Sequence, residues 1–271
     1  EGDAGTGMVA TNSVAPRTGN VSAGTSIFAM VVLEKPLSRV YPEIDMVTTP
    51  SGEAVAMVHC NNCTSDLNAW VSLLAESAAL CGAQVDQGTL FAKLFKESLR
   101  GAPDCGGVTP VNYFSGESVT HFDAGLPLLL HRPDADFTLA NFMRANIYSA
   151  FATLAMGLEI LKNEDVAVDT LLGHGGLFKT PGVAQRYLAA AAGAPVTCME
   201  TAGEGGPYGM ALLAAYRLHR AEGETLADYL KTRVFAGASS TTVTPDAADR
   251  AGFAAFLREY ERALKAERAV V

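Results

Sequence analysis

The sequence predicts an α/β protein built on a mixed sheet, and three observations support this fold class. Of the 271 residues, 49% are apolar and 18% are charged, which suits a large buried core and excludes a disordered chain. The first quarter of the chain holds short β-branched segments separated by turns, which is typical of hairpins. From residue 168 onward, apolar segments alternate with helical ones, which is typical of parallel strands joined by helices.

The N-terminal part predicts strands that pair as hairpins. Residues 21–33 have a β-branched centre and follow a Gly-Asn turn, so we expect a strand there. Residues 45–49 and 54–59 flank Pro50-Ser51-Gly52-Glu53, whose composition is a turn signal. These two segments should therefore pair as neighbouring antiparallel strands.

The middle of the chain predicts three helices and two short strands. Thr64 or Ser65 can cap a helix that continues to about residue 78, and a second helix is expected at about 87–99. A Gly- and Pro-rich stretch then contains strand-like pieces at 111–114 and 126–130. Apolar residues at helical spacing predict a long helix over 137–161.

The last part of the chain predicts strands that alternate with helices. We expect strands at 168–172 and 196–200, each followed by a glycine-rich turn and a helix, at about 181–192 and 207–221. A final helix over 246–267 carries apolar residues on one stripe and charges opposite. Because no linker or repeat interrupts this order, we expect one domain, residues 1–271.

Charge and cysteine content exclude several classes of function. The net charge is −9 and no Lys/Arg cluster occurs, which argues against nucleic acid as a partner. No apolar stretch reaches the ~18–20 residues of a membrane-spanning helix, so we expect no membrane partner. The five cysteines are odd in number and widely spread, which indicates reduced thiols and a cytoplasmic location. Cys60 and Cys63 have CxxC spacing but no second ligand pair, so we interpret them as packing thiols and expect no metal site.

Three glycine-rich turns carry the functional signal. They lie at Ser22-Ala23-Gly24-Thr25-Ser26, at Gly173-His174-Gly175-Gly176 and at Gly203-Glu204-Gly205-Gly206. Glycine lets backbone N–H groups approach an anion closely, and a following helix N-terminus adds a favourable dipole. Any one of them is typical of an ordinary strand-to-helix turn, but three in one domain favour a nucleotide site.

Two familiar phosphate motifs do not fit these turns. Residues 173–180 read G-H-G-G-L-F-K-T, and a P-loop would need glycine where Phe178 stands before the lysine. Residues 203–209 approach a dinucleotide-binding pattern, but the third glycine comes one position late and near the C-terminal end.

Asp3 is the other chemical candidate. A carboxylate in a short glycine-rich turn can accept a proton from a substrate hydroxyl. Aspartate is also a common turn former, so its position alone does not separate the two roles.

Together, these residues resemble the C-terminal half of the FGGY family of carbohydrate kinases. Gly2-Asp3-Ala4 followed by residues 21–26 is similar to the family's glycine-aspartate turn and its downstream G-T-S phosphate loop. Residues 172–185 are similar to its nucleotide loop, and 201–211 to the helix start that follows. The resemblance covers essentially the whole chain and does not identify a substrate; His174 and Lys179 depart from the common patterns.

The resemblance implies a ribonuclease H-like (actin-like ATPase) domain, with a mixed five-stranded sheet flanked by helices and a closing C-terminal helix. It implies that Asp3 is the catalytic base. It further implies that the nucleotide is bound by Gly24 and Thr25 near the transferring phosphate, by Asn68, by Gly175 and Gly176 at the α-phosphate and ribose, and by Thr180 near adenine.

The implied activity is ATP-dependent phosphorylation of a sugar or polyol, with ATP as cofactor and Mg²⁺ held mainly by the nucleotide. The chain opens on Glu1 without an initiator Met, so we expect residues 1–20 to be the remnant of an interdomain segment. The N-terminal sugar-binding lobe would be a missing partner, and the chain alone should not phosphorylate sugar. A homodimer stays open, as do two alternatives: an actin-like ATPase or activator domain, and a non-catalytic partner-binding module.

Overall fold

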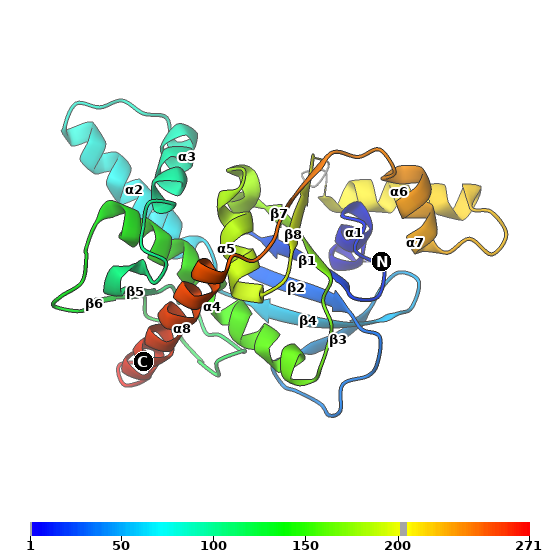
Figure 1. Ribbon diagram of the computed structural model, residues 1–271, viewed down its shortest axis with the longest axis horizontal. Helices are drawn as coiled ribbons and strands as arrows, with labels where there is room; N and C mark the ends of the chain where they lie inside the picture. The colour runs from blue at the N-terminus through cyan, green and yellow to red at the C-terminus, as the bar shows by residue number, and fades with distance from the viewer. Residues whose placement is uncertain (1, 201–204) are drawn as a thin grey trace.

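A computed structural model describes residues 2–200 and 205–271, with only the backbone described at residue 3. A mixed sheet of seven strands runs through the molecule, and helices cover both of its faces (Figure 1). The strand order is β3-β4-β2-β1-β7-β8-β9. The strands are β1 (Thr18–Ala23), β2 (Ile27–Val32), β3 (Asp45–Thr48), β4 (Ala54–Cys60), β7 (Thr170–Gly175), β8 (Val196–Met199) and β9 (Ser240–Val243).

The pairing directions follow the two halves of the sequence pattern. The strands β3, β4, β2 and β1 pair antiparallel: β1–β2 and β3–β4 are hairpins, and β2 pairs with β4 to join them. β1 pairs parallel to β7, β7 pairs parallel to β8, and β9 closes the edge antiparallel to β8. A separate antiparallel pair joins β5 (Val108–Val111) to β6 (Leu128–His131). The predicted mixed sheet is therefore confirmed.

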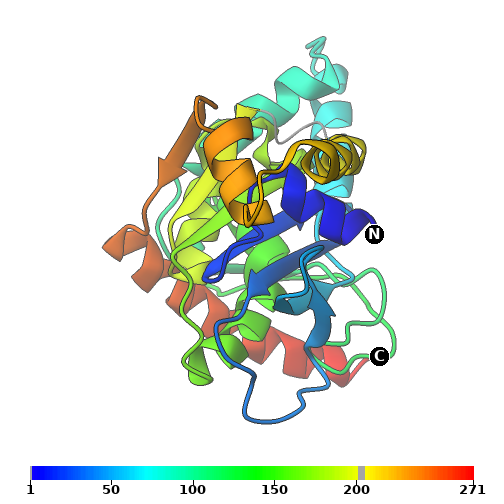
Figure 2. The ribbon, with the colours of Figure 1, turned by 90° about the vertical axis from the view of Figure 1, so that its right-hand side faces the viewer.

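Helices lie on both faces of the sheet. They are α1 (Asp3–Ala10), α2 (Ser65–Leu80), α3 (Gln87–Ser98), α4 (Leu139–Asn163), α5 (Val183–Ala192), α6 (Gly205–His219), α7 (Leu226–Tyr229) and α8 (Ala247–Arg268). Figure 2 shows α6 and α7 beside α1 on one side of the sheet, with α8 on the opposite side. None of the helices in the described ranges is both long and apolar enough to cross a membrane.

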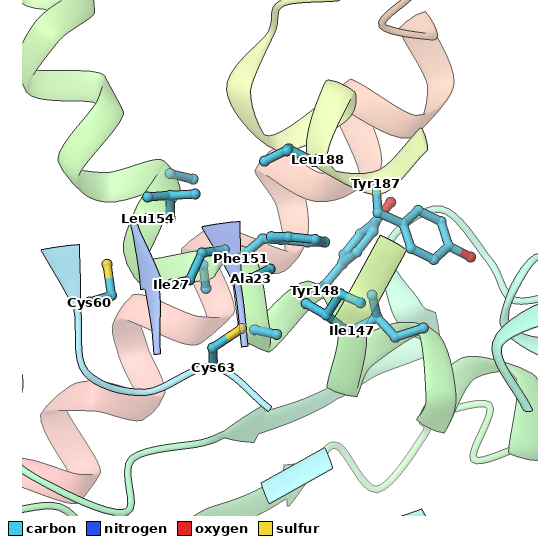
Figure 3. Close-up of a cluster of buried hydrophobic side chains, with 14 of the residues drawn as sticks. Ala23, Ile27, Cys60, Cys63, Ile147, Tyr148, Phe151, Leu154, Tyr187 and Leu188 are labelled. Carbon is cyan, nitrogen blue, oxygen red and sulfur yellow. The ribbon is translucent and has the colours of Figure 1, made fainter. Parts of the chain in front are cut away.

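Two apolar clusters hold the helices against the sheet. The larger packs α4, α5 and α8 on one face, with Phe151 of α4 close to Ala23 and Ile27 of the first hairpin (Figure 3). The smaller packs Met8 and Val9 of α1 against strand residues on the other face, together with α6 and α7. Because alternate residues of a strand point to opposite faces, β2 and β4 contribute to both clusters.

The structure corrects three expectations. The strand expected over 21–33 is two strands, because Gly24-Thr25-Ser26 forms a turn that reverses the chain. With β9, whose residues Ser240–Val243 are mostly hydroxylated and gave no apolar signal, the sheet has seven strands rather than the expected five. Asp3 begins a helix, α1, and does not lie in a turn.

Candidate functional site

The turn between β1 and β2 is held in place by the start of α2. The backbone N–H of Cys63 donates to the carbonyl of Thr25 at 3.0 Å, and the Thr64 hydroxyl donates to the carbonyl of Gly24 at 2.8 Å. Thr64 occupies the N-cap position of α2, but its side chain makes this long-range bond and no cap hydrogen bond. The positive end of the α2 dipole therefore lies beside a turn in which Thr25 is exposed and the Gly24 N–H donates to the Ser26 carbonyl at 2.9 Å.

The turn after β7 needs glycine for two different reasons. Gly175 has φ of +101°, and a Cβ there would lie 2.4 Å from the carbonyl oxygen of Ala23. A Cβ at Gly173 would lie 2.6 Å from the ring of Phe178. The backbone of this turn can therefore approach β1 closely, and it leads into a 3₁₀ turn at Gly176–Lys179.

A cavity of about 550 Å³ lies where these turns meet α2 and α3. This volume falls within the usual range for small-molecule sites. The lining comprises Gly24, Thr25, Thr64, Asn68, Gln87, Gly88, Phe91, Ala92, Phe95, Gly176, Leu177, Lys179 and Thr180. Segments more than 150 residues apart in the sequence thus form one site.

The lining combines an apolar wall with a few polar groups. Phe91 and Phe95 lie one helical turn apart on α3, with ring centroids 5.2 Å from each other. Asn68 on α2 offers both a donor and an acceptor. Lys179 is the one charged side chain among the lining residues, and it is exposed. Such a cavity suits a planar apolar group that carries hydrogen-bonding edges and a negative charge.

The cavity brings together most of the residues expected to bind nucleotide. Gly24, Thr25, Asn68, Gly176 and Thr180 all line it. Gly175 does not line it but shapes the turn that supplies Gly176. The side chain of Asp3 and the residues Gly203 and Glu204 of the third glycine-rich turn lie outside the described part of the chain.

Sequence reasoning missed several lining residues. Phe91 and Phe95 share one face of the expected helix with Leu90 and Leu94, and this spacing indicated only a helix face that packs on the core. Gln87 carried no signal of its own. In the sequence, Lys179 stands out only because it departs from the common pattern of the family's nucleotide loop. An aromatic helix face would indicate a binding site if it were known to lie beside the glycine-rich turns. That proximity is decided by the tertiary structure and cannot be read from the sequence.

The CxxC segment is part of the core. Cys60 and Cys63 are both buried, and burial raises the pKa of both thiols, so they are poor nucleophiles and metal ligands. Cys81, by contrast, is exposed. Among the described residues no group of three or more His, Cys, Asp or Glu side chains is placed to hold a metal ion.

Comparison with known proteins gives one family. The model of the FGGY family of carbohydrate kinases, C-terminal domain, matches residues 19–218. No curated protein sequence matches the chain.

Solved structures share the fold over the whole chain. A xylulose kinase from Rhodospirillum rubrum superposes with a TM-score of 0.76 and 17% identity, covering 99% of this chain and 51% of that one. A gluconate kinase from Lactobacillus acidophilus gives 0.72 and 16%, covering 97% and 50%. A glycerol kinase from Plasmodium falciparum, solved with ADP, gives 0.71 and 12%, covering 98% and 50%. This chain thus spans about half the length of the solved structures it matches.

Proposed function

The chain belongs to the FGGY family of carbohydrate kinases, as its C-terminal domain, and from this premise we propose that it supplies the nucleotide-binding lobe and the catalytic base of an ATP-dependent sugar or polyol kinase. Its ribonuclease H-like (actin-like ATPase) fold is that of the solved kinases. The proposal adds a role for the cavity and for Asp3.

The observation that carries the proposal is the meeting of two glycine-rich turns at one cavity. The apolar wall of Phe91 and Phe95 suits the base of a nucleotide, and Asn68 can bond its edge or the ribose. The turn amides near Gly24 and Gly176, with the Lys179 ammonium, suit the phosphates. In this arrangement the base lies against α3 and the phosphates extend towards the β1–β2 turn.

In this proposal Asp3 accepts the proton of the attacking sugar hydroxyl. The hydroxyl oxygen forms a bond to the γ-phosphorus as the bond to the bridging oxygen breaks, and ADP leaves. Phosphoryl transfer needs mainly positioning, charge neutralisation and one base. Mg²⁺ bound with the nucleotide would supply charge neutralisation, and it would need few protein carboxylates because phosphate and water oxygens are its usual ligands at such sites.

The sugar would come from a partner lobe. Because the solved kinases are about twice as long as this chain, we propose that a preceding lobe binds the sugar and closes onto this one.

The test is an ADP-release assay over a panel of sugars and polyols, on a protein that carries this chain behind such a lobe. Asp3→Asn should lower kcat by at least about 100-fold with little change in KM for ATP, because the base acts in the transition state. The control is Asp45→Asn, an exposed aspartate of β3, which should not change kcat.

Two outcomes would overturn the proposal. ADP release that is equal with and without any sugar would favour an actin-like ATPase. Adenine nucleotides that leave the melting temperature unchanged at millimolar concentration would favour a non-catalytic binding module.

A further inference from the structure

A row of register-paired residues, three of them polar and one a phenylalanine, crosses the sheet on the face covered by α1. Ser22 of β1 is paired in register with His174 of β7 and with Phe28 of β2, and Phe28 is paired with His59 of β4. Asn20 lies two residues before Ser22 and therefore points to the same face. The intervening Val21 belongs to the apolar cluster of the opposite face. This row lies immediately before the Gly24 turn.

His174 is oriented by a buried amide. The Nδ2 of Asn20 lies 3.4 Å from Nε2 of His174, and Asn20 is fully buried. With the amide nitrogen of Asn20 facing it, Nε2 acts as the acceptor of this long hydrogen bond, and in that tautomer the neutral imidazole carries its proton on Nδ1. Burial lowers the pKa of His174, which favours the neutral ring near pH 7.

The Asn20–His174 pair retains unused hydrogen-bonding capacity. Asn20 Oδ1 is buried without a hydrogen-bond partner, and no hydrogen bond to Nδ1 of His174 occurs among residues 2–200 and 205–271. A buried side-chain amide whose oxygen accepts no hydrogen bond is uncommon, because burying an unpaired polar atom destabilises the folded state. The presence of Asn20 at this buried position is explained if its amide holds the imidazole ring of His174 in the orientation that a ligand requires.

The α1 helix approaches this end of the row at Gly7. A side-chain carbon at Gly7 would lie 3.7 Å from Asn20 Nδ2, and one at Gly209 of α6 would overlap the carbonyl of Thr6. Because α6 starts soon after β8, which is parallel to β7 and β1, this contact places the N-terminal half of α1 near the carboxyl edge of these strands. Asp3 begins this helix, four residues before Gly7.

We propose that His174 is a specificity-determining residue of the nucleotide site, whose Nδ1–H donates a hydrogen bond to the γ-phosphate of bound ATP, with Asn20 as the positioning residue that holds its tautomer. This rests on the proposed function and deepens it, since ADP lacks the group that His174 contacts. A neutral hydrogen-bond donor to the phosphate contributes to the binding free energy without placing a positive charge beside the proposed catalytic base, Asp3.

The experiment measures the dissociation constants of Mg²⁺-AMP-PNP, Mg²⁺-ADP and adenosine for this chain by titration calorimetry. His174→Ala should weaken AMP-PNP about 10- to 100-fold, as expected for one hydrogen bond to a charged group, and leave ADP and adenosine unchanged. His174→Asn should keep AMP-PNP affinity within about threefold, because its amide nitrogen takes the place of Nδ1. His174→Gln puts the amide at the Nε2 position, facing Asn20, and should behave as His174→Ala.

His59→Ala is the matched control, since His59 lies in the same row about 14 Å away, at three strand spacings. It should leave all three constants unchanged. The inference is overturned if His174→Ala keeps the AMP-PNP to ADP ratio, if Gln restores affinity as well as Asn, or if adenosine binding falls equally. Unmodified chain that binds none of the three ligands overturns the proposed function together with the inference.

Discussion

At the scale of single residues, two neighbouring glycines have different reasons to be glycine. Gly175 has φ of +101° and touches the Ala23 carbonyl, so both its backbone angle and its surroundings exclude a side chain. Gly176 lines the cavity, and a Cβ there would meet nothing closer than 4.0 Å. The first is required by the fold, and the second leaves room for a ligand.

This difference predicts that alanine substitutions at Gly175 and Gly176 will have unequal effects on stability. Gly175→Ala should lower the free energy of unfolding by about 2–4 kcal/mol, because strain and a backbone overlap add together. Gly176→Ala should change stability by less than about 1 kcal/mol. Urea unfolding of the two variants measures this, and equal losses would contradict the assignment.

A second residue-scale feature is the buried carboxyl of Asp66 in the first turn of α2. It is 7% exposed, accepts a 3.2 Å hydrogen bond from Trp70 Nε1, and has its pKa raised to about 6 by burial. Trp70 is the single tryptophan of the chain and packs edge-on to Phe142. The indole of Trp70 should therefore report the ionisation of Asp66 through its fluorescence.

We expect Trp70 emission to titrate with a midpoint near pH 6. Because the folded-state pKa is above the unfolded value near 3.8, the folded state holds the proton longer, and stability falls as pH rises from about 4 to 6. Asp66→Asn keeps the acceptor for the indole and should be more stable than the unmodified chain at pH 8, by up to about 3 kcal/mol, with the difference shrinking below pH 5. Emission that does not change between pH 5 and 7.5 would contradict this.

At the scale of elements, a buried ion network joins α4, α5 and α8. Asp249, 1% exposed, accepts from Arg144 Nη2 at 2.6 Å and from Arg186 of α5. Arg144 is also buried, and its guanidinium lies over the rings of Tyr148 and Tyr187. The closing helix α8 is thus held by charge as well as by its apolar stripe.

Removing the shared carboxylate should be far more damaging than removing the exposed partner. Asp249→Asn leaves the Arg144 cation buried without its counter-ion and should lower the free energy of unfolding by about 3–5 kcal/mol. Arg186→Gln, at a 40% exposed side chain, should lower it by about 1 kcal/mol or less. Chemical denaturation measures both, and an Asp249→Asn loss no larger than that of Arg186→Gln would refute the network's role.

At the scale of the whole molecule, the sheet separates two packed faces. The face under α4 and α8 holds the larger core, while the face under α1 and α6 carries the row from His174 through Ser22 and Phe28 to His59. Figure 1 shows α2 and α3 extending from one end of the sheet, where they supply the cavity wall.

This arrangement predicts a separable activity. The 271-residue chain should bind nucleotide, so millimolar Mg²⁺-ADP should raise its melting temperature by ligand linkage. It should release no ADP in response to any sugar, because the proposed sugar lobe is needed to bring the hydroxyl to the phosphate. Sugar-dependent ADP release by the purified chain would show that the second lobe is dispensable.

Local patterns were sufficient to predict most of the elements. Helices such as α4 and α8 and the strands β4, β7 and β8 were predicted from periodicity and turn residues, because each of these segments carries its own signal. The short β9 was missed, since its polar residues form a strand only by pairing with β8. The α1 helix was missed because its glycines are poor helix formers, and packing against α6 compensates for that.

The sequence by itself determined the fold class, the family and the chemistry of the turns, because glycine placement and strand-to-helix order are local properties. Only the tertiary structure decided that Gly24, Asn68, Phe91 and Thr180 face one cavity, and that Asn20 orients His174. These contacts join residues far apart in the chain. They depend on strand register and helix packing, which no single segment specifies.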